Sequence, residues 1–310
     1  MTIAAAVGLG LGWLADQAFG DPRRGHPVAG FGRLAGAWEK RLYADDRRAG
    51  TVFTATLVGG VAGLGWLAGR VCRGRPVAQA LVTAAATWTV LGGRSLAREA
   101  EFISDALQAD DLAAARARLP HLVSRDPAGL DADQIARATL ESVAENTSDA
   151  VVAPLFWGAV AGLPGLLGYR AINTLDAMVG YRNPRYRNFG WASARLDDLA
   201  NWLPARLAGE LATRLAFVVG GRAEDAARAV AEQAPAHPSP NGGVVEAAFA
   251  GALGVTLGGT NSYDGVAENR GELGTGPAPT PPDLARGVKL AQAVGLGSAL
   301  IAIAIARGRR

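Results

Sequence analysis

The chain has 310 residues, of which 49% are hydrophobic and only 19% are charged, and its formal net charge is +3. The charged share lies below that of ordinary soluble domains, and several groups of basic residues lie in short loops, a pattern that fits membrane flanks better than the basic stripe of a nucleic-acid-binding protein. Cys72 is the only cysteine, which excludes an intrachain disulfide and a cysteine-based metal site. We expect no nucleic-acid partner.

Charge-free apolar runs recur along the chain at lengths close to the roughly 20 residues that a membrane-spanning helix needs. They predict membrane helices near 2–20, 51–69, 76–93, 150–168 and 288–306. The apolar N-terminus lacks the charged first region of a signal peptide, so we interpret it as a retained helix. The segment 243–259 is rich in glycine and has polar residues close behind it, which favours a re-entrant or buried helix.

Amphipathic segments separate these runs and predict water-facing helices. They lie at 32–43, 95–120, 131–146 and 193–219, and the second of them predicts a soluble helical hairpin. Segments rich in Gly and Pro predict loops at 20–32, 182–190 and 263–283. No strand-period pattern stands out. We therefore predict one all-α, multi-pass membrane domain over residues 1–310, with amphipathic helices on one side.

One predicted helix carries ionisable residues at every fourth position, namely Arg137, Glu141, Glu145 and Asp149. This spacing places them on one broad helix face, where three carboxylates repel one another unless a cation lies among them. A solvated face with an Arg137–Glu141 pair is the alternative. Because the face leads directly into an apolar run, where charges are costly, we favour a functional role.

A second helix carries Asp197 and Asn201 four residues apart, with Asp198 beside the first. Oxygen ligands of this kind suit Mg²⁺, which commonly bridges substrate phosphates. The nearby Arg182, Arg185, Arg187 and Arg195 suit bidentate phosphate binding, or serve equally well as positive flanks of membrane helices.

Two polar loops stand beside helix starts. The first contains Asp21 and His26, and the second runs from His237 through Asn241 to two glycines. Backbone N–H groups at a glycine-rich helix start can hold an anion. A histidine between prolines serves as a general base or only as a turn residue.

Several motifs, in this order, resemble the adenosylcobinamide-phosphate synthases of cobalamin biosynthesis. They are Asp16-x-x-x-Gly20-Asp21-Pro22 with His26-Pro27-Val28, Ser124-Arg125-Asp126, Glu141-Ser142-Val143-Ala144-Glu145-Asn146, the run from Asn173 to Tyr181, the run from Ser193 to Asn201, and His237-Pro238-Ser239-Pro240-Asn241-Gly242-Gly243. The resemblance extends from Gly12 to the C-terminal tail.

The resemblance implies a multi-pass enzyme that joins adenosylcobyric acid to aminopropanol phosphate, or a close amino-alcohol phosphate, with ATP as co-substrate and Mg²⁺ as cofactor. We expect the metal ligands to come from Glu141, Glu145, Asp176, Asp197, Asp198 and Asn201. The expected substrate and phosphate contacts are Asp21, His26, Arg125, Asn173, Arg182, Arg185, Arg187, Arg195 and Asn241. The expected catalytic residues are Asp126, Glu145 and His237.

The expected partners are the corrinoid, the amino-alcohol phosphate and the lipid bilayer, with a homo-oligomer or a complex with other late corrin-pathway enzymes as a further expectation. We expect the cell membrane as location, with an active site facing the cytoplasm, where ATP is available. Two other functions stay open at this stage: a transporter of a corrin or phosphorylated solute, because ionisable groups in membranes often mark transport paths, and a non-catalytic sensor or scaffold.

Overall fold

A computed structural model describes residues 3–22, 25–123, 127–181, 183–263 and 266–308, without the side chains of residues 261–268. The chain forms two compact units, each assembled from separate segments. The first unit contains residues 1–92, 149–202 and 298–310, and the second contains residues 93–148 and 203–297. The single domain that the sequence predicted over residues 1–310 stays a prediction.

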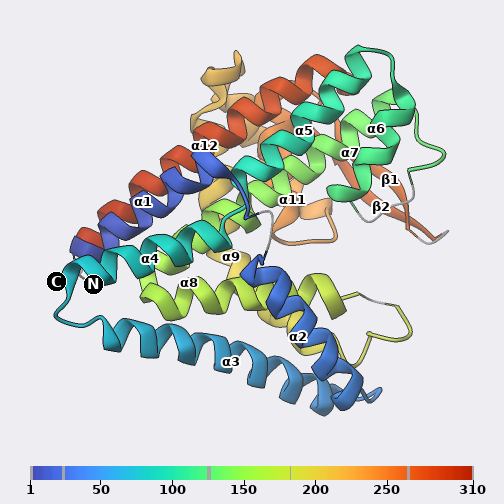
Figure 1. The fold of residues 1–310 in the computed structure, drawn as a ribbon. Helices are drawn as coiled ribbons and strands as arrows, with labels where there is room; N and C mark the ends of the chain where they lie inside the picture. Colours follow the sequence, from blue (N-terminus) through green and yellow to red (C-terminus); the bar gives the residue numbers. More distant parts are fainter. Residues whose placement is uncertain (1–2, 23–24, 124–126, 182, 264–265, 309–310) are drawn as a thin grey trace. The chain divides into compact units, whose positions relative to one another are not determined.

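The first unit consists of helices that pack in pairs. Its elements are α1 (Ile3–Phe19), α2 (Pro27–Leu42), α3 (Arg47–Val71), α4 (Pro76–Val90), α8 (Ala153–Val179), the first part of α9 (Trp191–Arg214) and the last part of α12 (Pro281–Gly308). Helix α1 packs along α4, and α3 runs beside α8, which also contacts α2 (Figure 1).

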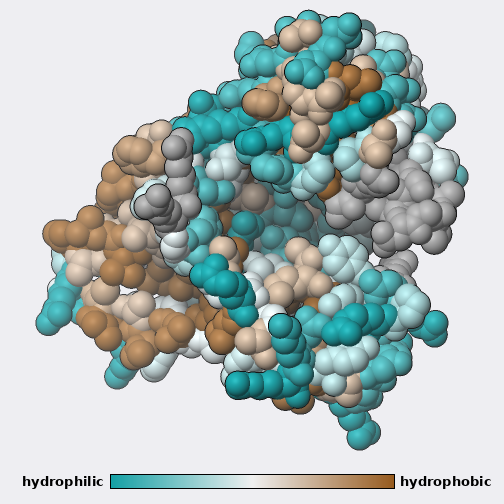
Figure 2. Space-filling view, turned by 45° about the vertical axis from the view of Figure 1, so that its right-hand side comes forward, coloured by the Kyte–Doolittle hydropathy of each residue, from teal (hydrophilic) through white to brown (hydrophobic). Residues whose placement is uncertain are grey.

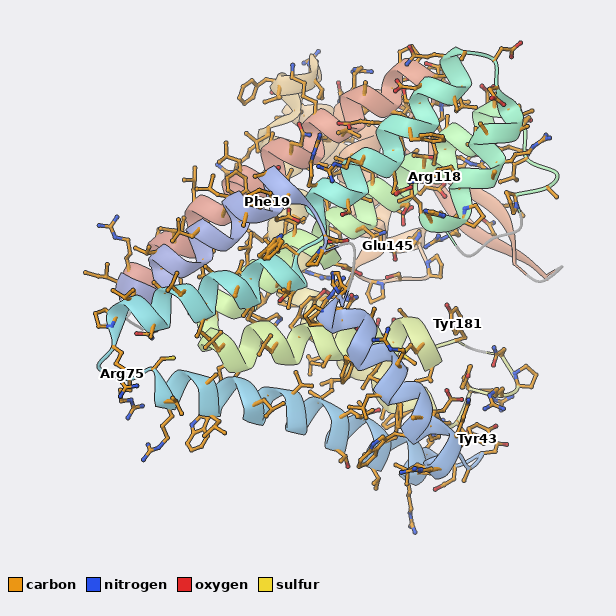
Figure 3. The ribbon with its side chains drawn as sticks, in the orientation of Figure 1. Phe19, Tyr43, Arg75, Arg118, Glu145 and Tyr181 are labelled. Carbon is orange, nitrogen blue, oxygen red and sulfur yellow. The ribbon has the colours of Figure 1, made fainter. Side chains whose placement is uncertain are left out.

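Buried apolar clusters hold these pairs together. Leu9 and Leu155 are fully buried with small residues of α12, such as Ala299. Phe53 and Phe189 belong to a second buried cluster, with ring centroids 5.0 Å apart, and Tyr43 at the end of α2 packs on Phe189 (Figure 3). Burial of such apolar surface is the main stabilising contribution to the unit.

The second unit combines helices with a small hairpin. It contains α5 (Gly93–Gln108), α6 (Leu112–Arg118), α7 (Ala132–Thr147), α10 (Ala223–Glu232), α11 (Gly242–Leu253) and the antiparallel strands β1 (Leu257–Tyr263) and β2 (Val266–Leu273). Single turns at Leu119–His121, Ala216–Val219 and Ala234–Ala236 connect some of these helices. Helix α5 packs on α6 and α7, while α11 contacts α7, α10 and both strands.

Capping residues explain several helix starts. The Asp131 carboxylate accepts the Gln134 backbone N–H, and the Gln134 side chain accepts the Asp131 N–H, so α7 begins with a complete capping box. His26 caps α2 through Nδ1, with Pro27 at the first helical position. Asp46 caps α3 by accepting two backbone N–H groups.

Among the described residues, three continuous helical stretches are long and apolar enough to cross a membrane: Arg47–Val71, Ala132–Val179 and Pro281–Gly308. The predicted all-α, multi-pass membrane architecture is confirmed. Helix α1, with 17 residues, and α4, with 15, are shorter, and the crossing of a bilayer by these two stays a prediction.

Three local features differ from the sequence expectation. The apolar run at 150–168 starts in a π-helical turn, Ser148–Val152, and is broken at Gly162, whose φ of 69° and ψ of −153° are non-helical. The buried helix expected at 243–259 ends at Leu253, because Gly254 adopts a left-handed conformation. Residues 257–263 form β1, and residues 266–273 of the segment expected to form a loop are β2. The two strands pair through backbone hydrogen bonds that need no clear alternation of side chains.

Candidate functional site

A hydrogen-bonded chain of side chains joins α8 to α9 within the first unit. The Tyr169 hydroxyl donates to Asn201 Oδ1 at 2.8 Å and also lies 3.1 Å from the backbone oxygen of Asp149. Asn201 Nδ2 in turn donates to Asp197 Oδ2 at 2.9 Å. The four-residue spacing of Asp197 and Asn201 places both on the same face of α9, which permits this contact.

Within this series of hydrogen-bonded side chains, the Asp197 carboxylate is the group whose hydrogen-bonding capacity is least satisfied. Its Oδ1 atom is buried and has no hydrogen-bond partner among the described residues. Burial and the negative charge of Asp176 raise the pKa of Asp197 to about 7, although the Asn201 and Asn173 side chains oppose the rise. A buried acid that lacks a cation is costly when ionised, so this group is suited to receiving a positively charged ligand.

Arg170 supplies the positive charge of the same cluster. Its Nη1 donates to Asn173 Oδ1 at 3.2 Å, and Asn173 Nδ2 lies 3.5 Å from Asp149 Oδ2. The guanidinium also interacts electrostatically with Asp21 and Asp149, while its Nε atom is buried and has no hydrogen-bond partner among the described residues. The Arg170 guanidinium therefore keeps a donor available for an anion.

The loop before α2 contributes two of the predicted contacts. His26 Nε2 lies 3.9 Å from Asp21 Oδ1, and Nδ1 accepts the Val28 backbone N–H at 3.2 Å. Because Asp21 interacts with Arg170, the loop belongs to the same polar cluster. We call this set the first-unit cluster; it consists of Asp21, His26, Asp149, Tyr169, Arg170, Asn173, Asp176, Asp197 and Asn201.

The first-unit cluster fits a magnesium ion that is shared with a phosphorylated ligand. Within the described parts of the chain, no three His, Cys, Asp or Glu side chains group closely enough to hold a metal by themselves. Mg²⁺ is, however, usually held by one or two carboxylates plus substrate phosphates and water. The unpartnered Asp197 Oδ1 atom, with Asp176 nearby, provides oxygen ligands of that kind.

In the second unit, Glu141 already has protein partners. Its Oε1 accepts the Gly258 backbone N–H at 2.9 Å and lies 3.8 Å from Arg137 Nε. Glu141 is buried, and Gly258 lies at the bulge of β1. This acid therefore ties α7 to the hairpin, and the Arg137–Glu141 pair weighed as the alternative does form.

In the second unit, His237 contacts Arg270 and Glu246, and the three side chains form a buried ionic group. Arg270 Nε donates to His237 Nε2 at 3.0 Å, and Nδ1 lies 3.1 Å from both the backbone nitrogen and the backbone oxygen of Ser239. Glu246 Oε1 lies 3.5 Å from His237 Nε2 and 3.6 Å from Arg270 Nη2. Burial and the charge of Arg270 lower the pKa of His237 to about 4. Both ring nitrogens are engaged inside the protein.

Glu145 lies one helical turn after Glu141 on α7 (Figure 3). Its side chain is half-buried and has no hydrogen-bond or ion-pair partner among the described residues. Of the two α7 acids that were predicted as metal ligands, Glu145 is therefore the one that is available to a ligand.

The remaining predicted residues lie apart from these groups or have other partners. Arg195 forms a solvent-exposed ion pair with Asp198, at 3.7 Å, and Asn241 accepts a hydrogen bond from Arg206 at 3.1 Å. Arg185 binds Glu39 at 2.8 Å, and that hydrogen bond raises its pKa. Arg187 is exposed. The predicted residues Arg125, Asp126 and Arg182 lie outside the described residues.

Sequence reasoning did not identify four residues as site residues. Tyr169 and Arg170 belong to the first-unit cluster, and Glu246 and Arg270 belong to the ionic group around His237. Tyr169 and Arg170 were visible as the polar end of a charge-free run, a position where a charge is seldom without function. Glu246 was visible as a lone acid in an otherwise apolar helix. Arg270 gave no comparable signal, because it lies in a segment that was expected to be a loop.

Comparison with known proteins identifies relatives along nearly the whole chain. Residues 9–291 match the family described as CobD/Cbib protein. Proteins called "Cobalamin biosynthesis protein CobD" are 53% identical in Mycobacterium tuberculosis H37Rv, covering 98% of this chain and 97% of the relative, and 45% identical in Chromobacterium violaceum, covering 92% of each. A Rhodobacter capsulatus relative of the same description is 43% identical, covering 97% of this chain and 95% of its own. No solved structure matches the chain.

Proposed function

The chain belongs to the CobD/CbiB family and acts in cobalamin biosynthesis, and we propose that it joins adenosylcobyric acid to aminopropanol phosphate, or a related amino-alcohol phosphate, in an ATP-dependent reaction. The product is adenosylcobinamide phosphate, and the new bond is an amide. The observation that carries the proposal is the first-unit cluster, in which Arg170 and the unpartnered Asp197 carboxylate oxygen lie among other acids and amides.

The proposed chemistry has two steps. A carboxylate is a poor acyl donor, so its oxygen first takes the γ-phosphoryl group of ATP, and ADP leaves. The free amine then attacks the acyl carbon, the bond from that carbon to the phosphate oxygen breaks, and the nitrogen loses a proton as phosphate departs. Protein catalysis of such transfers comes mainly from positioning and from neutralising charge.

We assign phosphate binding to the basic part of the first-unit cluster. Arg170 offers its unpartnered Nε, and Asn173 holds Nη1 of the same guanidinium in place. Asp197, Asn201 and Asp176 would hold Mg²⁺, which supplies positive charge against the phosphates when it is bound. Arg187 and Arg195 are solvent-exposed and are further candidates for the phosphate contact.

Two described residues are candidates for accepting the proton of the amine. Glu145 has a carboxylate without a partner among the described residues, whereas the ring nitrogens of His237 already bond to Arg270 and to Ser239. We therefore favour Glu145 over His237, whose side chain must leave its present contacts to reach any ligand.

We propose the cell membrane as the location, with the nucleotide-binding face toward the cytoplasm, because ATP is found there. Three candidate spans and the apolar surface of the first unit support the membrane assignment. Assembly as a homo-oligomer, or with other late corrin-pathway enzymes, remains part of the proposal.

The experiment that tests the function uses purified, detergent-solubilised protein. We expect the amide product, detected by mass spectrometry, when adenosylcobyric acid, aminopropanol phosphate, ATP and Mg²⁺ are all present, and none when any one is omitted. Asp197→Asn should lower turnover by about 100-fold or more, whereas Asp198→Asn, one residue away on the exposed side, should keep most of it. Absence of product with the complete mixture, or normal turnover of Asp197→Asn, would refute the assignment.

A transporter would give a different result. Sealed liposomes containing the protein would then accumulate the corrin or the phosphorylated amine without forming the amide. We expect no such uptake.

A further inference from the structure

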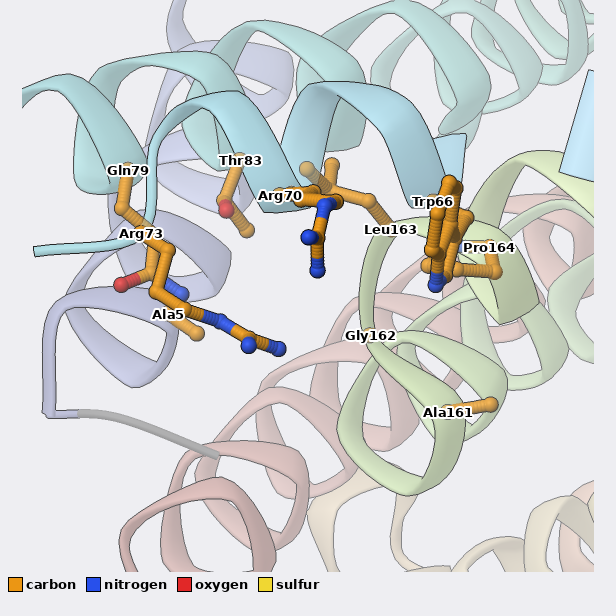
Figure 4. A pocket seen from close by; sticks show the side chains of 11 residues that line it. Ala5, Trp66, Arg70, Arg73, Gln79, Thr83, Ala161, Gly162, Leu163 and Pro164 are labelled. Carbon is orange, nitrogen blue, oxygen red and sulfur yellow. The ribbon is translucent and has the colours of Figure 1, made fainter. Parts of the chain in front are cut away.

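A basic pocket opens at one end of the first unit, away from the residues of the first-unit cluster. Its walls come from α1, the last turn of α3, the turn that leads into α4, and the break in α8 at Gly162 (Figure 4). The non-helical backbone of Gly162 interrupts α8 at this wall. The cavity has a volume of about 250 Å³.

Two guanidinium groups give the pocket its charge. Arg70 and Arg73 extend toward the same space in front of the α8 break (Figure 4). Neither has an ion-pair partner among the described residues, and no acidic side chain lines the cavity. Arg70 lies 5.7 Å from the centre of the Trp66 ring, a cation–π contact that leaves its N–H donors available. The pocket is therefore suited to an anion.

The surroundings of the pocket are those of a membrane interface. Arg70 lies in the last turn of α3, a candidate membrane span, and Trp66, four residues before it, is 58% exposed. Tryptophan is enriched where membrane helices meet water. Large apolar side chains nearby on α3 and α4 are exposed as well: Leu64, Leu67, Val71, Val77 and Leu81. Figure 2 shows hydrophobic surface gathered over the part of the first unit where α1, α3 and α4 come together.

The size of the cavity limits what it can hold. Pockets that enclose a whole small molecule usually measure about 300–1,000 Å³, so this one holds a charged group whose remainder lies outside. The exposed apolar residues of α3 and α4 offer a surface for acyl chains.

We propose that Arg70 and Arg73 bind the phosphate of an anionic phospholipid headgroup, with its acyl chains lying along α3 and α4. The site fixes this end of the first unit at the headgroup level of an anionic leaflet. Basic pockets at the membrane ends of helices are a common way to bind such lipids.

Native mass spectrometry of the detergent-solubilised full chain tests the proposal. The protein is titrated with phosphatidylglycerol and, separately, with phosphatidylcholine of the same acyl chains. We expect the wild type to prefer phosphatidylglycerol by about 30-fold, because each of two basic residues contributes to the attraction. Arg70→Gln/Arg73→Gln should reduce this preference to about threefold or less.

A control with the same change in charge is available. Arg48 lies at the opposite end of α3 and Arg75 lies outside the pocket lining, so Arg48→Gln/Arg75→Gln should keep the full preference. Arg70→Lys/Arg73→Lys should keep most of it, which separates loss of charge from loss of folding. The proposal is overturned if the glutamine pair at the pocket still prefers phosphatidylglycerol, if the control pair loses the preference equally, or if the lysine pair shows none.

A third titration distinguishes a lipid from a free phosphate. Glycerol 3-phosphate carries the same charged group without acyl chains, and we expect it to displace phosphatidylglycerol only at concentrations at least about 100-fold higher, since burial of the chains contributes most of the affinity. Displacement at equal concentration would identify a site for soluble phosphates and overturn the lipid assignment.

Discussion

Tyr169 donates its hydroxyl to Asn201 Oδ1 at 2.8 Å and thereby joins α8 to α9. This bond determines the orientation of the Asn201 amide, because with Oδ1 toward Tyr169 the Nδ2 group faces Asp197 Oδ2. The Tyr169 hydroxyl on α8 therefore determines how Asn201 donates its hydrogen bond to the Asp197 carboxylate on α9. Ala153 and Ala200 are buried beside Tyr169, and Tyr169 itself is buried, so the bond is shielded from water.

The Tyr169→Phe variant tests this arrangement. It keeps the ring and removes only the hydroxyl, so we expect the free energy of unfolding to fall by about 1 kcal/mol. We expect turnover to fall by about 10-fold, as is common when a residue that orients a ligand is lost. Tyr43→Phe is the matched control, because that hydroxyl donates to the Arg185 oxygen on an exposed surface. Equal effects of both variants in amide formation and urea unfolding would contradict the prediction.

Asp197 makes stability depend on pH. Its pKa is about 7 in the folded chain against an ordinary value of 3.8. Between these values the folded state retains a proton that the unfolded state has released, so the contribution of Asp197 to the free energy of unfolding should fall as pH rises from 3.8 to about 7. Urea unfolding across this window should show that the free energy of unfolding of Asp197→Asn rises with pH relative to that of the wild type. Asp198→Asn, which removes a smaller cause of the raised pKa, should change the pH dependence less.

A divalent cation should reverse that loss of stability. Because a bound cation favours the ionised carboxylate, Mg²⁺ with ATP should raise the melting temperature of the wild type more at pH 8 than at pH 6. This difference should be absent in Asp197→Asn. An equal Mg²⁺ effect in wild type and variant at both pH values would place the metal elsewhere.

Substitution of Glu141 should lower mainly stability and substitution of Glu145 should lower mainly activity, although both residues lie on α7. Removal of Glu141 leaves the Gly258 N–H unpaired, so Glu141→Ala should lower the free energy of unfolding by about 2 kcal/mol. Glu145 has no such partner among the described residues, and Glu145→Ala should change stability by less than about 0.5 kcal/mol. If Glu145 accepts the proton of the amine, its variant should lose about 100-fold in turnover. Normal turnover in Glu145→Ala would exclude it from the reaction.

The sequence predicted relationships within single helices better than those between elements. Apolar run lengths indicated the all-α membrane architecture, and the four-residue spacing placed Asp197 and Asn201 on one face. The sequence could not show that Tyr169 would reach Asn201, because that contact depends on the packing of α8 against α9 in the folded unit.

The hairpin and the surroundings of His237 were beyond sequence reasoning for a similar reason. Strands β1 and β2 contain Gly258, Gly259 and Gly271 instead of the alternating apolar residues that mark most strands. Without the hairpin, Arg270 had no predicted neighbour. The sequence left His237 as a general base or a turn residue, and in the structure its Nε2 atom accepts a hydrogen bond from Arg270 inside the second unit.

The Arg270 contacts predict strong effects in the second unit. Arg270→Met leaves Glu246 buried without its nearest guanidinium, so we expect a loss of about 3–5 kcal/mol. Arg228→Met, which removes an exposed ion pair with Asp225, should cost about 0.5 kcal/mol or less.

The pKa of His237, about 4 in the fold and 6.5 ordinarily, means that the contribution of His237 to stability should fall as pH falls from 6.5 to about 4. Urea unfolding at several pH values, with His237→Gln as the variant that lacks this slope, provides the measurement.

The close approach of α3 to the α8 break should make Gly65 intolerant of a side chain. A Cβ atom there would lie 2.8 Å from the Leu163 oxygen and 2.9 Å from the Pro164 nitrogen, and both are backbone atoms that cannot move aside cheaply. We expect Gly65→Ala to lower the free energy of unfolding by about 1–3 kcal/mol. Gly60 lies on the same helix with nothing within 4 Å of such a Cβ, so Gly60→Ala should be neutral or slightly stabilising, because alanine favours a helix. Melting of both variants in one detergent gives the comparison, and a Gly65→Ala protein as stable as Gly60→Ala would show that α3 and α8 are not in close contact at this point.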